Sequence, residues 1–98
     1  MARIELASEV GEDIERILDH LVKNEVDDAA ARIGEIIQAI SVLEQTPLIG
    51  RPADGEKREL VIGRRTRGYL ARYRYVADID TVFVLALRGQ PEAGYTRT

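Results

Sequence analysis

The sequence predicts a small α+β domain, and three observations lead to this fold class. Residues 8–46 contain two stretches in which apolar residues recur every three or four positions, which is the spacing of amphipathic helices. Residues 58–62, 69–77 and 81–88 are rich in aromatic and β-branched residues and are bounded by turn formers, as strands are. A chain of 98 residues that is 45% hydrophobic can build one core. We therefore expect a single domain over residues 1–98, with a helical hairpin packed on one face of a three-stranded antiparallel sheet.

The elements are expected in the order strand, two helices, three strands. Residues 2–7 alternate polar and apolar side chains, which predicts a short N-terminal strand. Ser8 is the candidate N-cap of the first helix, and Asp27 or Asp28 is that of the second. Pro47 should end the second helix, because proline cannot donate a backbone hydrogen bond. The short break between the helices predicts that they are antiparallel neighbours.

The last two strands are predicted to form a β-hairpin with its turn at residues 78–80. Side chains on a strand alternate between the two faces, so Tyr69 and the odd-numbered residues after it point one way. The even-numbered residues, which include Arg72 and Arg74, point the other way. The second arm is apolar at six successive positions, 82–87, which indicates a central strand with both faces covered. One sheet face should therefore pack on the helices while the other carries arginines.

Charge is distributed unevenly along the chain. Residues 1–46 hold 4 basic and 11 acidic side chains, a net of −7, whereas residues 51–74 hold 8 basic and 3 acidic, a net of +5. The remaining residues contribute −1, which gives the total of −3. A basic strip in an acidic protein favours a localised anionic partner, and a solvated sheet face is the alternative interpretation.

Composition disfavours several classes of function. The chain has no cysteine, so disulfides and thiolate zinc sites are impossible, and no metal or cofactor motif is visible. Neither a run of about 18 apolar residues nor a signal peptide is present, so we expect a cytoplasmic protein without a membrane partner. His20 is expected on the surface of the first helix. Glu9, Glu12, Asp13 and Asp19 are expected to be solvated on its polar side.

Several short motifs follow one another in a distinctive order. They are Pro47-Leu48-Ile49-Gly50-Arg51-Pro52, Arg58-Glu59-Leu60, Gly68-Tyr69, Tyr73-Arg74, and Val82-Phe83-Val84-Leu85 before Arg88. Together with the order of elements they resemble the RelE/ParE superfamily of bacterial toxins, the toxin halves of type II toxin–antitoxin modules, often called plasmid stabilisation proteins. The resemblance covers essentially the whole chain. It implies a small toxin held inactive by a cognate antitoxin of the ParD or RelB kind, with operator DNA bound only through that antitoxin.

RelE-like members of the superfamily cut messenger RNA on the ribosome without a metal, using a basic cluster and a tyrosine. In that branch an arginine follows the Gly-Tyr pair and another lies just past the last strand, but this chain has Leu70 and Gln90-Pro91 there. If the chain is nevertheless such an endoribonuclease, the candidate catalytic residues are Lys57, Arg88 and Tyr95. Arginine stays protonated and can clamp a phosphate, so proton transfer would fall to Lys57 or Tyr95.

ParE-like members inhibit DNA gyrase and need a binding surface rather than a catalytic site, and the long helical hairpin and the 47–52 loop fit this branch better. Gyrase inhibition without enzymatic activity or a cofactor is therefore our leading hypothesis. Guanidinium groups pair well with carboxylates and phosphates. The candidate target-binding residues are Arg58, Arg64, Arg65, Arg72, Arg74 and Arg88. A third hypothesis is a non-toxic decoy that binds the antitoxin alone.

Overall fold

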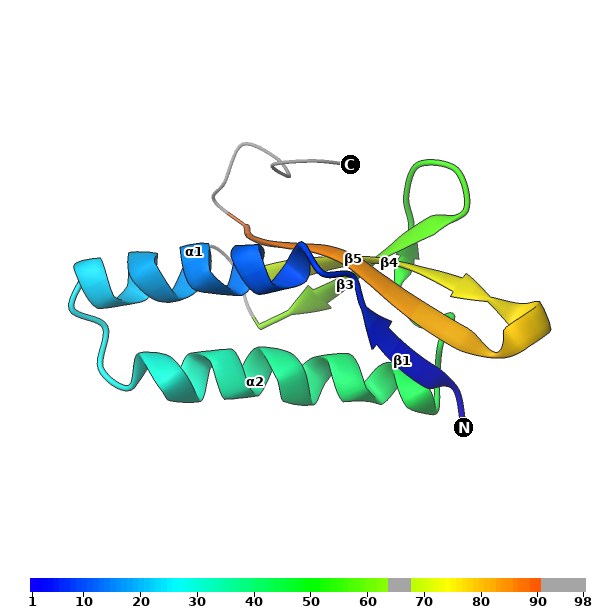
Figure 1. The fold of residues 1–98 in the computed structure, drawn as a ribbon, viewed down its shortest axis with the longest axis horizontal. Coiled ribbons are helices and arrows are strands. Elements are labelled where there is room, and N and C mark those ends of the chain that lie inside the picture. Colours follow the sequence, from blue (N-terminus) through cyan, green and yellow to red (C-terminus); the bar gives the residue numbers. More distant parts are fainter. Residues whose placement is uncertain (64–67, 91–98) are drawn as a thin grey trace.

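A computed structural model of the chain describes residues 1–63 and 68–90 (Figure 1). In chain order the elements are β1 (Arg3–Leu6), α1 (Val10–Lys23), α2 (Ala29–Ser41), the 3₁₀ turn η1 (Val42–Glu44), β2 (Arg51–Pro52), β3 (Lys57–Ile62), β4 (Tyr69–Val76), the 3₁₀ turn η3 (Ala77–Ile79) and β5 (Thr81–Gly89). The predicted α+β class and the order of its main elements are confirmed. Within the described ranges, no helix is long and apolar enough to cross a membrane.

The sheet has five strands in the order β1-β5-β4-β3-β2, which is larger than the predicted sheet. The three predicted strands form its antiparallel centre, β3-β4-β5. The N-terminal strand β1 joins the sheet in parallel with β5, in the register Arg3↔Thr81 to Leu6↔Val84. The two-residue strand β2 pairs with β3 and was not predicted. Two residues are too few to show an alternating pattern.

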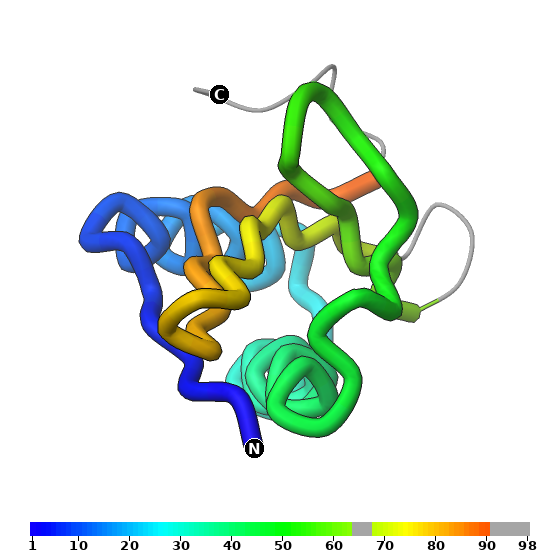
Figure 2. Tube along the Cα trace, turned by 90° about the vertical axis from the view of Figure 1, so that its right-hand side faces the viewer, coloured from blue at the N-terminus to red at the C-terminus, as the bar shows by residue number. Residues whose placement is uncertain are grey.

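Both helices pack on the same face of the sheet, as expected, and Figure 2 shows the sheet end-on with α1 beside it and α2 beneath it. The core joins apolar residues of both helices to residues of the three central strands. Its fully buried members include Val10, Ile36, Leu43, Tyr73 and Leu87. Among residues 1–63 and 68–90, no helix covers the opposite side of the sheet, which we call the outer face and where a binding surface can lie.

A β-bulge in β5 lies within the apolar run of residues 82–87. Arg72 pairs with Ala86 whereas Tyr73 pairs with Val84, so Leu85 is an extra residue in β5. The extra residue shifts the alternation by one. Val84 before the bulge and Leu87 after it therefore both reach the core. The prediction that this strand is central is confirmed, since β5 lies between β1 and β4.

The edge of β5 beyond β1 is covered by the first turns of α1. The Asp13 carboxylate accepts a hydrogen bond from the Leu87 backbone N–H at 3.0 Å, and the Arg16 guanidinium donates to the Leu87 carbonyl at 2.9 Å. Arg16 also pairs with Asp13 at 2.9 Å. Asp13 is only 1% exposed, so the prediction that it is solvated was wrong. Its position, three residues after Val10 and four before Ile17, lies on the apolar stripe of the helix.

The helix ends differ from prediction at Ser8. Its hydroxyl donates to the Glu9 carboxylate at 3.2 Å, and no side-chain cap is made at the start of α1. Asp28 immediately precedes α2, as expected, with a left-handed backbone conformation (φ 57°) and no side-chain cap. His20 is exposed, which confirms its predicted surface position.

Candidate functional site

The strand register places a group of charged side chains on the outer face. Ala71 and Tyr73 point into the core, so their even-numbered neighbours in β4 point outward. Residues paired across neighbouring strands share a face of the sheet. The outer-face residues of β2 to β5 that bear on function are Arg51, Lys57, Glu59, Val61, Leu70, Arg72, Arg74 and Arg88.

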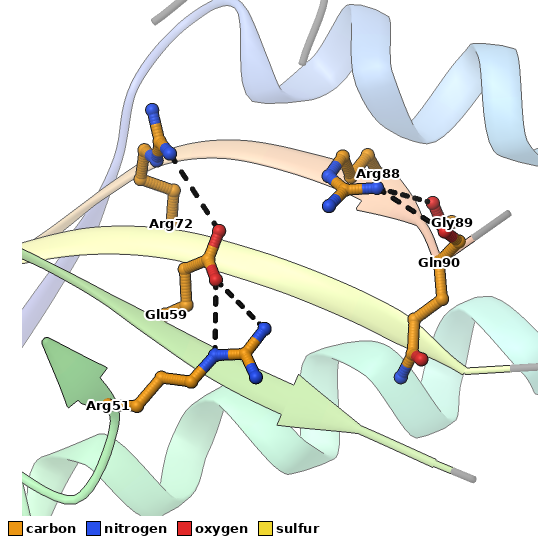
Figure 3. Close-up of polar contacts among 6 residues, drawn as sticks. All are labelled: Arg51, Glu59, Arg72, Arg88, Gly89 and Gln90. Carbon is orange, nitrogen blue, oxygen red and sulfur yellow. Dashed lines mark hydrogen bonds and ion pairs between the residues drawn. The ribbon is translucent and has the colours of Figure 1, made fainter. Parts of the chain in front are cut away.

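Glu59 lies at the centre of this face, between two arginines (Figure 3). One of its carboxylate oxygens accepts hydrogen bonds from the Nε and a terminal nitrogen of Arg51, at 3.2 and 3.0 Å. Its other oxygen lies 3.8 Å from the guanidinium of Arg72. The side chains of Glu59 and Arg72 are each 13% exposed, whereas that of Arg51 is 60% exposed. The three strands β2, β3 and β4 are thus joined by one continuous ion-pair network.

Arg74 and Lys57 extend the positive charge toward the turn that precedes β3. They are register partners across β3 and β4. Arg74 forms an ion pair with Glu56 at 2.9 Å, and both side chains are substantially exposed, at 49% and 79%. Because an exposed ion pair contributes little free energy, Arg74 can exchange Glu56 for an external anion at small cost.

Arg88 lies at the other end of the outer face. Its guanidinium donates to the carbonyls of Gly89 and Gln90, at 3.3 and 3.4 Å, and so stays close to the end of β5 (Figure 3). Its partner in β4 is Leu70, which is 4% exposed. The position at which the RelE-like branch has an arginine is therefore filled here by a buried apolar side chain.

Arg58, a predicted target-binding residue, lies on the helix side of the sheet, opposite Tyr73 in the register. Its guanidinium donates to the carbonyls of Leu48 and Gly50, at 3.2 and 2.8 Å. The Gly50 N–H donates to the Tyr73 hydroxyl at 2.8 Å. These bonds hold the 47–52 loop in place. Leu48 and Ile49 remain 57% and 58% exposed, so the loop presents two apolar side chains on a fixed backbone.

Two tyrosines have a raised pKa, for different reasons. Burial is the main cause for Tyr73, which is 0% exposed and was expected in the core. The hydrogen bond from Gly50 and the charge of Arg58 partly oppose this rise in the pKa. The pKa of Tyr75 is raised chiefly because its hydroxyl donates to the Asp80 carboxylate at 2.6 Å. Neither phenol is therefore prepared to act as a base at neutral pH.

The residues proposed for RNA cleavage are not assembled by the part of the chain that the structure describes. Lys57 pairs with Arg74 and Arg88 pairs with Leu70, four residues away along β4. Lys57 lies in β3 and Arg88 in β5, so their backbone positions are about 13 Å apart along the strands and about 9.6 Å apart across the sheet. Tyr95, Arg64 and Arg65 lie outside the described residues. Within residues 1–63 and 68–90, no three His, Asp or Glu side chains could hold a metal ion.

The sequence interpretation missed Arg51, Glu56 and Glu59 as members of this face. The period of two does place Glu59 on the face opposite to Arg58. Its contact with Arg51 and Arg72 depends on the register of three strands, which a single sequence does not fix.

The chain matches a known family in sequence and solved structures in fold. A family model described as "ParE toxin of type II toxin-antitoxin system, parDE" matches residues 4–93. Among solved structures, the fold is similar to a chain of the chromosomal ParDE toxin–antitoxin system from P. aeruginosa. That match has a TM-score of 0.75 at 20% sequence identity and covers 91% of this chain and 96% of that chain.

A conserved hypothetical protein from Helicobacter pylori has a similar fold as well. Its TM-score is 0.50 at 22% identity, over 92% of this chain and 96% of that chain. A search of curated proteins gives no significant match. The family model spans nearly the whole sequence, and the fold agrees with it. The chain therefore belongs to the ParE toxins of type II toxin–antitoxin systems, within the RelE/ParE superfamily.

Proposed function

We propose that this toxin acts in the bacterial cytoplasm by binding DNA gyrase, and that a cognate antitoxin neutralises it. The observation that carries the proposal is the buried Leu70 opposite Arg88. Charge developing on a scissile phosphate needs cations fixed around it, and here a leucine stands where the RelE-like branch has one. A binding surface does not need several cations fixed around one phosphate, so gyrase inhibition is favoured over RNA cleavage.

The 47–52 loop supports a protein target. Leu48 and Ile49 are exposed apolar side chains on a backbone fixed by Arg58 and Tyr73. Protein interfaces draw most of their binding free energy from a few apolar or arginine anchors that enter pockets of the partner. Arg51, the next exposed residue of the loop, supplies a cation beside this apolar pair.

The exposed side of α2 suits an antitoxin. Ile37 of α2 is 43% exposed, and Val42, the first residue of the following turn η1, is 46% exposed. A shallow open groove runs along the same helix, with Ala31, Gly34 and Ala39 among its lining residues. Small side chains beside apolar ones allow an amphipathic segment of a partner to approach closely. We place the antitoxin on this helix surface, away from the outer face.

The test is a supercoiling assay with purified gyrase and the full chain, combined with induction of the chain in a bacterium. We expect inhibition of supercoiling, and an arrest of thymidine incorporation before amino-acid incorporation. Arg74→Ala removes an exposed cation of the outer face and should weaken inhibition while antitoxin binding is retained. Lys23→Ala, at the end of α1, is the matched control because it removes a cation far from that face.

Three results would contradict the proposal. Arrest of amino-acid incorporation first would indicate ribosome-dependent RNA cleavage. Arrest of neither process, with antitoxin binding intact, would identify a decoy. Equal inhibition by wild type and by a combined Arg51→Ala and Arg74→Ala variant would remove the outer face from the gyrase interface.

A further inference from the structure

Glu59 is the only acidic residue that β2, β3 or β4 contributes to the outer face within the described residues, and each of its carboxylate oxygens contacts an arginine. It contacts Arg51 through one oxygen and Arg72 through the other. Only 13% of its side chain is exposed, and it forms ion pairs with arginines of two neighbouring strands. Its surroundings therefore resemble those of a bound anion.

Arg51 and Arg72 are spaced to share a single anion. They belong to β2 and β4, which flank β3, so their backbones are about 9.6 Å apart across the sheet. The Glu59 carboxylate lies between the guanidinium groups of Arg51 and Arg72, each of which contacts a different one of its oxygens (Figure 3). A phosphate has the charge and the acceptor oxygens to accept the same two forks.

Removal of this carboxylate would make the outer face strongly basic. Among the described residues of β2 to β5, its cations are Arg51, Lys57, Arg72, Arg74 and Arg88. A group of cations spread across four strands is an electrostatic footprint for a nucleic-acid backbone. Glu59 opposes such binding in two ways, because it repels phosphates and because it already occupies the two nearest guanidinium groups.

We infer that Glu59 is a specificity-determining residue that excludes phosphodiester anions from a latent binding site between Arg51 and Arg72. The face is thereby kept for a protein partner, which approaches through the exposed loop and Arg74 rather than through the centre of the sheet. The inference deepens the proposed function, on which it rests for the use of the outer face.

The test is direct binding of a fluorescent single-stranded oligonucleotide to the purified full chain across a salt series. We expect Glu59→Gln to bind roughly tenfold or more tightly than wild type at 50 mM salt. Each phosphate contact on a single strand adds about 0.7 to the slope of log affinity against log salt, so one phosphate newly bound between Arg51 and Arg72 adds about 0.7. Between 50 and 200 mM salt the variant should therefore lose about 2.6-fold more affinity than wild type.

Two controls separate this mechanism from a general change in charge. Glu35→Gln on α2 changes the net charge by the same amount on the helix side of the molecule, and its binding should equal that of wild type. Adding Arg51→Gln to the Glu59→Gln variant should remove most of the gain, because it removes one of the two forks. Glu59→Ala serves as a second neutral variant, and circular dichroism at 10 °C confirms that each protein is folded.

The inference is overturned if neither neutral variant gains affinity, if Glu35→Gln gains as much, or if the gain persists without Arg51. The assay contains no gyrase, so its outcome is independent of whether the toxin inhibits that enzyme. If Glu59→Gln binds the oligonucleotide more tightly but the wild-type chain does not inhibit supercoiling by gyrase, the role of Glu59 is upheld and the proposed target is rejected.

Discussion

Substitution of Gly50 by alanine should displace the 47–52 loop from the sheet and destabilise the fold. A Cβ atom at this position would lie 2.6 Å from both the Cε1 and the hydroxyl oxygen of Tyr73, and 2.8 Å from the Glu59 carbonyl. Overpacking of this kind costs about 1–3 kcal/mol. Displacement of the Tyr73 ring also breaks its hydrogen bond with the Gly50 N–H, and a buried unsatisfied donor costs about 1–3 kcal/mol more.

The expected loss is about 3 kcal/mol in the free energy of unfolding, measured by urea denaturation. For a domain of this size that corresponds to a fall in Tm of roughly 12–24 °C. Gly34→Ala is the matched control, because no atom lies within 4 Å of a Cβ built there. It should stabilise α2 by about 0.5–1 kcal/mol, since alanine has the higher helix propensity.

A double-mutant cycle tests the cause of the loss. With Tyr73→Leu the two closest atoms are gone, so the additional cost of Gly50→Ala should fall by about 1–2 kcal/mol. Strictly additive effects would show that the Tyr73 ring is not what excludes a side chain at Gly50. A cost for Gly50→Ala below about 1 kcal/mol would refute the steric argument itself.

Two further predictions concern buried polar groups. Asp13→Ala should lower the free energy of unfolding, measured by urea denaturation, by about 2–3 kcal/mol, because the Leu87 N–H loses its acceptor and Arg16 loses its ion-pair partner. The control Glu12→Ala changes an exposed neighbour and should stay within about 0.5 kcal/mol of wild type. Burial raises the pKa of Tyr73, so the folded state holds the phenolic proton more tightly than the unfolded state, and stability should decline as the pH rises above about 10. Urea midpoints at pH 8 and pH 11 should show a smaller decline for Tyr73→Phe than for wild type, and equal declines would contradict the assignment.

Hydrophobic spacing predicted most of the fold, and local sequence could not supply the remainder. The α+β class, the helical hairpin and the three central strands follow from periodicity, because burial on one side repeats along each element. The bulge at Leu85 is hidden in an apolar run that a regular central strand would also produce. Asp13 was misassigned because a carboxylate on a helix is usually solvated, although its spacing was that of the core.

The functional face was predicted in part. The outward direction of Arg72 and Arg74 follows from alternation in β4, and their position on the outer face agrees with it. Arg58 was grouped with them, but strand β3 turns it toward the 47–52 loop. The role of Glu59 depends on contacts between residues 51, 59 and 72, which only the register of three strands brings together.

The parallel pairing of β1 with β5 has a consequence for the timing of folding. Arg3 pairs with Thr81, so the separation along the chain is 81 minus 3, or 78 residues. At a synthesis rate of about 5–20 residues per second, β1 waits about 4–16 s for its partner strand to be made. Contacts of such long range also slow folding after synthesis, because the intervening chain must first be ordered. The sheet is therefore completed late, because β1 has no partner strand until β5 has been made.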